Sequence, residues 1–200
     1  MWLYAFLKVF FFTIYRLFFR AEFRGVEHIP MEGRVILAAN HMSNADPPLI
    51  GCHIPRNLNY MCKEELFHVP FIGWVLRTTQ TIPVKRGTGD RGAIRTAQQA
   101  LRAEKMIALF PEGHRARDGR MRKAQPGVGL LAALSGAPVI PVCIIGTDRI
   151  FANGGIFPKL YVTYGEPMYF TGDKKDKQAL ADFSQSILDR IAEMKKEIQP

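Results

Sequence analysis

Cysteine is scarce in this chain of 200 residues. Cys52, Cys62 and Cys143 form no C-x-x-C pair, so the spacing typical of a zinc site is missing. Their odd number argues against a disulfide framework, and together they favour a reducing compartment. The chain also lacks an internal repeat, a low-complexity tract and a linker rich in Gly or Ser. One domain is therefore expected, because 200 residues can build one sizeable core but not two comfortable ones.

Acidic residues are outnumbered, with 18 Asp and Glu against 27 Lys and Arg, and the formal net charge is +9. Such an excess indicates an anionic partner, which on charge alone is a phosphate ester, an acidic membrane surface or a nucleic acid. A surface that only keeps the protein in solution explains the charge equally well. Because 48% of the residues are apolar, a packed globule is expected rather than disorder.

Charged residues are almost missing from the first nineteen positions, where only Lys8 and Arg16 interrupt an apolar and aromatic run. As a helix this run is roughly 28 Å long, barely enough to span a bilayer. No basic residue precedes it and no small-residue cleavage site follows it, unlike a signal peptide. Lys8, Arg16 and Arg20 share one helical arc of about 120°. Residues 1–24 are therefore expected to lie in the membrane interface, with packing on the chain's own domain as the alternative.

From residue 34 onward, short apolar runs alternate with helical patterns. Strands are predicted at residues 34–40, 80–85, 106–110, 139–145 and 159–164. One helix is predicted with Asp46 as its N-cap, and a second with Asp90 as its N-cap and an end near residue 104. A third is predicted to end near Gly136, and a last one closes the chain with apolar residues at three- and four-residue spacing. Residues 25–200 are thus predicted to form one α/β domain with a largely parallel central sheet flanked by helices.

The first polar loop after a predicted strand is residues 40–46, NHMSNAD. His41 and Asp46 stand five residues apart, and a turn can fold the carboxylate back onto the imidazole. Asp46 would then fix the tautomer and leave the other ring nitrogen free to accept a proton. The alternative makes Asp46 only the N-cap of the next helix and His41 only a turn residue. Without a G-x-S-x-G elbow, Ser43 is interpreted as a hydrogen-bonding loop residue rather than a nucleophile.

A second polar loop, Lys85-Arg86-Gly87, follows the strand predicted at residues 80–85. Such a loop suits an anion, because a guanidinium matches phosphate oxygens and glycine lets the backbone approach closely. An ordinary basic turn is the alternative. Since the carboxyl ends of parallel strands share one edge of a sheet, this loop is expected near His41.

A third loop, residues 110–115 (FPEGHR), follows the most apolar predicted strand, and its Pro and Gly indicate a tight turn. Arg115 could hold a phosphate at the edge where His41 lies. Glu112 could orient a substrate hydroxyl or fix Arg115 in place. The alternative is a surface ion pair that contributes little.

Four ordered blocks in this chain resemble those of the glycerolipid acyltransferase family, which includes bacterial lysophosphatidate acyltransferases. Residues 40–46 resemble its N-H-x-S-x-x-D block, residues 82–87 its second block, residues 110–115 its F-P-E-G-T-R block and residues 139–142 its V-I-P-V block. One block is weak evidence, but four in the right order are specific. The chain departs from the family at His114, where Thr is common.

The resemblance implies that His41 and Asp46 are the catalytic pair. It also implies a set of residues that help to bind the glycerol phosphate: Arg86, Gly87, Glu112, Gly113 and Arg115. Asn40, Ser43, Lys85 and Pro141 are expected to support them. Residues 139–142 are expected to pack in the core, with the lining of an acyl channel as a second role.

The expected reaction moves a fatty acyl group from acyl-CoA or acyl carrier protein to the free hydroxyl of lysophosphatidate, giving phosphatidate. The resemblance places it at the cytoplasmic face of the cell membrane, and it requires no metal, cofactor or nucleic acid. Three alternatives stay open: another lysolipid acceptor such as a lyso-aminolipid, a lipid thioesterase or hydrolase, and a non-catalytic lipid-binding protein. The last does not explain the ordered set of loops.

Overall fold

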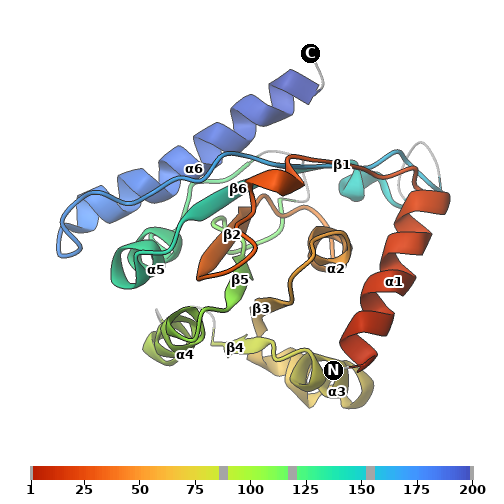
Figure 1. Cartoon of the computed structure of the whole chain (residues 1–200), viewed down its shortest axis with the longest axis horizontal. Helices are drawn as coiled ribbons and strands as arrows, with labels where there is room; N and C mark the ends of the chain where they lie inside the picture. Colours follow the sequence, from red (N-terminus) through yellow and green to blue (C-terminus); the bar gives the residue numbers. More distant parts are fainter. Residues whose placement is uncertain (1, 86–89, 117–120, 152–155, 199–200) are drawn as a thin grey trace.

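The computed structural model describes residues 2–85, 90–116, 121–151 and 156–198. In chain order the elements are α1 (Trp2–Leu17), β1 (Glu22–Arg24), η1 (Val26–His28), β2 (Val35–Ala39), α2 (Asp46–Cys52), β3 (Leu58–Lys63), η2 (Glu64–His68), α3 (Pro70–Thr78), β4 (Ile82–Val84), α4 (Arg91–Arg102), β5 (Met106–Leu109), α5 (Gly127–Ser135), β6 (Val139–Ile145), η3 (Thr147–Arg149), β7 (Tyr161–Tyr164) and α6 (Lys177–Ile198) (Figure 1). The alternation of strands and helices confirms the predicted α/β class.

Among the described residues, seven strands form one sheet in the order β1-β7-β6-β2-β5-β3-β4. Every neighbouring pair is parallel except β6 and β7, which confirms a largely parallel sheet. The register places Ile36 of β2 between Ile107 of β5 and Val139 of β6. At one edge, β1 pairs with β7, so the sheet extends into the segment 1–24. The carboxyl ends of β2 and β5 therefore lie side by side.

Helices cover both faces of the sheet. In Figure 1, α1 and α2 lie on one side of the central strands, and α4, α5 and α6 lie on the other. The side chains of β2 divide between two core clusters: Val35 and Leu37 pack with α1 and α2, whereas Ile36 and Ala38 pack with α4, α5 and α6. This burial on both faces explains why β2, β5 and β6 are continuous apolar runs.

Two helix boundaries agree with the sequence, and one does not. The Asp90 carboxylate accepts hydrogen bonds from the N–H groups of Gly92 and Ala93, which confirms it as the N-cap of α4. Gly136 ends α5 with a positive φ of 64°. The predicted N-cap at Asp46 is wrong, because Ala45 is the N-cap and Asp46 is the first residue of α2. The Asp46 carboxylate bonds to the turn before the helix instead.

One face of the N-terminal helix α1 packs against the domain. Phe11, Phe12 and Ile14 contact the core, and Tyr4 and Lys8 make hydrogen bonds. The Tyr4 hydroxyl accepts a hydrogen bond from the N–H of Leu58 at 2.7 Å, and the Lys8 ammonium donates one to the carbonyl of Ile54. The opposite face exposes large apolar side chains, namely Trp2, Phe6, Val9, Phe10 and Leu17, and Phe18 directly after the helix is exposed as well. No helix in the described part of the chain is long and apolar enough to cross a bilayer. The alternative of packing on the domain is therefore correct for one face of α1, while the other face stays uncovered.

Candidate active site

The turn formed by residues 40–46 folds back on itself as the spacing predicts. Asp46 is fully buried, and its Oδ2 accepts hydrogen bonds from Nδ1 of His41 at 2.8 Å and from the N–H groups of Met42 at 2.7 Å and Ser43 at 2.8 Å. One oxygen thus fixes both the turn and the ring. Because Nδ1 donates to Asp46, Nε2 is the basic nitrogen of the neutral imidazole. Among the described residues, His41 Nε2 has no hydrogen-bond partner.

The His41 ring is held from the side as well. It stacks on the Phe110 ring with centroids 3.9 Å apart and an angle of 17° between the planes, and its side chain is only 12% exposed. The His41 carbonyl accepts a hydrogen bond from the N–H of Ala116 at 2.8 Å. Both contacts come from the loop after β5, so this loop confines the imidazole that the turn after β2 presents.

Glu112 is 2% exposed and connects the two loops through backbone groups. Its Oε1 accepts from the N–H of His41 at 3.0 Å, and its Oε2 accepts from the N–H of Arg122 at 2.9 Å. Of the two roles considered for Glu112, fixing Arg115 in place is wrong, because Arg115 donates to Oδ1 of Asn44 at 2.9 Å instead. Orienting a substrate hydroxyl stays a prediction. A buried carboxylate that lies next to two backbone N–H donors accepts hydrogen bonds from them in preference to a guanidinium at the surface.

The tight turn in the third loop is confirmed. The N–H of Gly113 donates to the carbonyl of Phe110 at 3.0 Å, and Gly113 has a φ of 70°, a conformation that favours glycine. Arg115 follows this turn and reaches across to Asn44, so the structure brings the first and third loops together. His114 is exposed on the same turn.

Asn40, Ser43 and Pro141, which were predicted to support the site, contact the backbone and core around it. The buried Asn40 side chain donates to the carbonyl of Ile144 and accepts from its N–H, at 2.9 and 2.7 Å, and so ties the end of β2 to β6. The Ser43 hydroxyl accepts from the N–H of Ala45 at 3.3 Å. Pro141 is buried in β6 opposite Ala38, so core packing of this block is confirmed.

Of the second loop, Arg86 and Gly87 lie outside the described residues. Lys85 is exposed at the end of β4, where its ammonium lies 3.8 Å from the Glu64 carboxylate and its N–H donates to Asp90. Since β3 and β5 separate β4 from β2, Lys85 stands at a distance from His41 in the sheet. Binding of substrate by this loop stays a prediction.

Sequence analysis misses two residues that contact the turn formed by residues 40–46. Phe110 was recognised as part of a block but was given no contact with His41. Tyr15 of α1 is buried, and its hydroxyl donates to the carbonyl of Ala45 at 3.0 Å. Burial, and to a smaller extent the nearby Asp46 carboxylate, raises the pKa of Tyr15, so the hydroxyl keeps its proton. Nothing in the local pattern of α1 pairs Tyr15 with Ala45.

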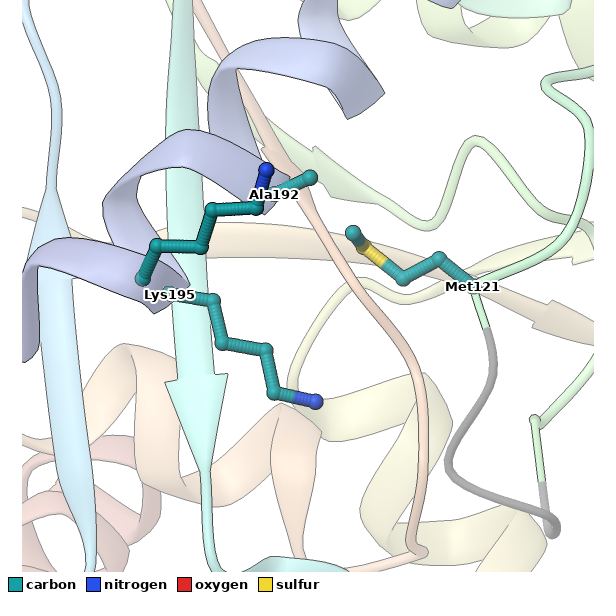
Figure 2. Close-up of a pocket in the computed structure, with 4 residues that line it drawn as sticks. Met121, Ala192 and Lys195 are labelled. Atoms are coloured by element: carbon teal, nitrogen blue, oxygen red, sulfur yellow. The ribbon is translucent and has the colours of Figure 1, made fainter. Parts of the chain in front are cut away.

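A hollow of about 280 Å³ lies between α6 and the chain near Met121 (Figure 2). Its lining residues are Met121, Ala192, Lys195 and Lys196. None of them was predicted for the site, and residues 139–142 are not among them. This hollow is therefore not the predicted acyl channel.

Residues 20–145 match a family model described as Acyltransferase, and this range contains all four blocks. The chain is 26% identical over 140 residues to the chloroplastic 1-acyl-sn-glycerol-3-phosphate acyltransferase BAT2 of Brassica napus, covering 68% of this chain and 40% of that one. It is 31% identical over 186 residues to the 1-acyl-sn-glycerol-3-phosphate acyltransferase of Pseudomonas aeruginosa, covering 90% and 71%.

A crystal structure of the 1-acyl-sn-glycerophosphate acyltransferase of Thermotoga maritima superposes with a TM-score of 0.75 at 25% identity. The superposition covers 96% of this chain and 80% of that one. By contrast, the chain spans only about 40% of the length of its plant relatives from Brassica napus and Arabidopsis thaliana. Because the family model covers more than half of the chain, this protein belongs to the acyltransferase family.

Proposed function

We propose that this acyltransferase moves a fatty acyl group from acyl-CoA or acyl carrier protein to the free hydroxyl of lysophosphatidate, giving phosphatidate. The carrying observation is the His41–Asp46 pair, whose 2.8 Å hydrogen bond leaves Nε2 available at the carboxyl edge of the sheet. The relatives' names support lysophosphatidate as the acceptor. Both proposed donors carry the acyl group as a thioester, from which the thiol departs readily.

In the proposed mechanism, Nε2 of His41 accepts the proton of the acceptor hydroxyl as that oxygen attacks the thioester carbonyl. The new C–O bond gives a tetrahedral intermediate, the C–S bond then breaks, and the thiolate leaves with the proton that His41 returns. Asp46 stabilises the imidazolium that exists between these steps. A base positioned in this way typically contributes about 10²–10⁴ in rate. No covalent intermediate on the enzyme is needed.

The acceptor phosphate is proposed to bind beside the third loop. Arg115 supplies a guanidinium that matches phosphate oxygens, and the positive φ of Gly113 keeps the turn tight. Arg86 and Gly87 are proposed to add to this anion site from the second loop. Glu112 contributes by holding the loop, because its two carboxylate oxygens bond to the N–H groups of His41 and Arg122.

The enzyme is proposed to work on the cytoplasmic face of the cell membrane, attached through the outer face of α1. Exposed Trp2, Phe6 and Phe10 would lie among lipid headgroups, while Tyr4 and Lys8 hold the helix to the domain. This arrangement places the domain where a lysolipid acceptor is found and where the product must return.

The test measures release of thiol from acyl-CoA and from acyl carrier protein in the presence of a panel of lysolipids. Lysophosphatidate is expected to stimulate release, and the new ester should be recovered as phosphatidate. Release without any acceptor would indicate a hydrolase. Stimulation by a lyso-aminolipid but not by lysophosphatidate would change the acceptor. Lipid binding without any turnover would contradict the enzymatic function altogether.

A further inference from the structure

The segment formed by η2 and α3, residues 64–78, exposes apolar side chains to an unusual degree. The exposed large residues are Leu66, Val69, Phe71, Ile72 and Trp74, and Phe71 is 73% exposed. In α3, all of which the structure describes, Gly73 alone is buried. A side chain there would meet the carbonyl of Phe67 at 2.2 Å, so α3 attaches to η2 through its backbone and turns its side chains outward.

These side chains play no part in the described core. No residue of η2 or α3 belongs to either core cluster among the described residues. Exposed aromatic and aliphatic surface on this scale typically marks a binding surface, because water tolerates it poorly. Packing of the core therefore does not explain why large apolar residues occupy positions 71 and 74.

The position of the segment relates it to the proposed reaction. Its first residue, Glu64, directly follows β3, which lies next to β5 and parallel to it. The segment thus leaves the sheet at the same carboxyl edge as the loops that carry His41 and Glu112. Lys85 also ties its start to the end of β4 through the contact with Glu64.

The exposed aromatic residues of α3 fit lipid better than a second protein surface. Trp and Phe next to cations are typical of residues that lie at the level of lipid headgroups. Exposed Arg77 lies in the last turn of α3, with its guanidinium 6.0 Å from the centre of the Phe67 ring. The whole chain carries a net charge of +9. Figure 1 places α1, whose outer face is also apolar, on the same side of the central strands as α3.

We infer that η2 and α3 form a second membrane-contacting element, and that a phospholipid bilayer covers Phe71, Ile72 and Trp74 in the working enzyme. This inference rests on the proposed membrane attachment, which it extends from one helix to two. With contacts from both α1 and α3, the bilayer would meet the domain beside the edge that carries His41. A lysolipid could then reach the site without leaving the membrane surface.

The two tryptophans, Trp2 in α1 and Trp74 in α3, allow each element to be tested separately. Trp2→Phe leaves Trp74 as the only indole, and Trp74→Phe leaves Trp2. Fluorescence of each full-length variant is measured with vesicles of phosphatidylcholine and phosphatidylglycerol, with and without bromine on the acyl chains. Quenching of Trp74 by brominated lipid is expected. Quenching of Trp2 alone would overturn the inference and leave α1 as the only contact.

A matched pair of substitutions tests the same surface in vesicle sedimentation. Phe71→Ser should weaken binding by about tenfold or more, as expected for the loss of one buried aromatic side chain. Met31→Ser is the control, since Met31 is 64% exposed but precedes β2, at the opposite edge of the sheet. Equal effects of the two would overturn the inference. So would a change in molecular mass by light scattering in Phe71→Ser, because a second copy would then cover the surface. Neither readout requires turnover, so failure of the proposed reaction remains distinguishable.

Discussion

The hydroxyl of Tyr15 donates to the carbonyl of Ala45 at 3.0 Å, so a residue of the outer helix α1 is bonded to the residue directly before Asp46. Asp46, whose carboxylate holds His41, is the first residue of α2. The start of α2 is therefore held in place by a hydrogen bond from α1. Sequence analysis assigns residues 1–24 to the membrane interface and residues 25–200 to the domain that carries His41 and Asp46. The contact instead couples the proposed attachment of α1 to the geometry of the proposed base.

Tyr15→Phe is expected to lower kcat by about tenfold, because small displacements of a catalytic group reduce rate strongly. The loss of this hydrogen bond should also lower the free energy of unfolding by about 1 kcal/mol. Tyr164→Phe is the control, since the Tyr164 hydroxyl donates to the carbonyl of Ile50, farther along α2. Steady-state kinetics and urea unfolding measure both effects. Equal losses of kcat in the two variants would show that Tyr15 only stabilises the fold.

His41→Ala is expected to reduce kcat by about 10²–10⁴ while the protein stays folded, because it removes the proposed base. Asp46→Asn should also impair turnover strongly, since an amide cannot supply the charge that stabilises the imidazolium. Thiol release and circular dichroism measure the two properties. Near-normal kcat in folded His41→Ala protein would rule out the mechanism.

Arg115→Ala is expected mainly to raise KM for a phosphate-bearing acceptor, by about tenfold or more, because it removes charge-assisted hydrogen bonds. A neutral lysolipid should be affected less. Asn44→Ala removes the partner of Arg115 but not its charge, and so serves as the control. If Arg115→Ala impaired both acceptor types equally, its role would be structural.

Glu112→Gln is expected to lower the free energy of unfolding by about 1–3 kcal/mol. A glutamine can accept from only one of the two backbone N–H groups that Glu112 now satisfies, those of His41 and Arg122. The other would face the amide NH₂ in a buried position. Thermal or urea unfolding tests this directly. Unchanged stability together with a raised KM would favour direct contact of Glu112 with the acceptor.

The features that the sequence predicts best are those set by residues close together in the chain. Continuous apolar runs identified β2, β5 and β6 because these strands are buried on both faces. The five-residue spacing of His41 and Asp46 predicted their contact because one turn closes it. By contrast, β1 is a three-residue edge strand with the pattern EFR, and β3 reads LNYMCK, so neither shows a clear period.

Contacts between distant segments could not be predicted in this way. Glu112 and Arg115 are three residues apart and of opposite charge, yet Glu112 bonds to backbone groups while Arg115 reaches Asn44. Which partner each selects depends on the approach of two loops that are far apart in the chain. Sequence analysis also misses the exposed face of α3, because Gly73 weakens the helical pattern of this nine-residue helix.

The pairing of β1 with β7 has a consequence for biosynthesis. Glu22 leaves the ribosome well before its partner Tyr161, which lies far along the chain. Loop closure over such a length delays the pairing, and α1 lies directly before β1 in the chain. The aromatic residues of α1 thus emerge well before their sheet edge is complete. We expect the nascent helix to need cover in that interval, from a chaperone or from the bilayer itself.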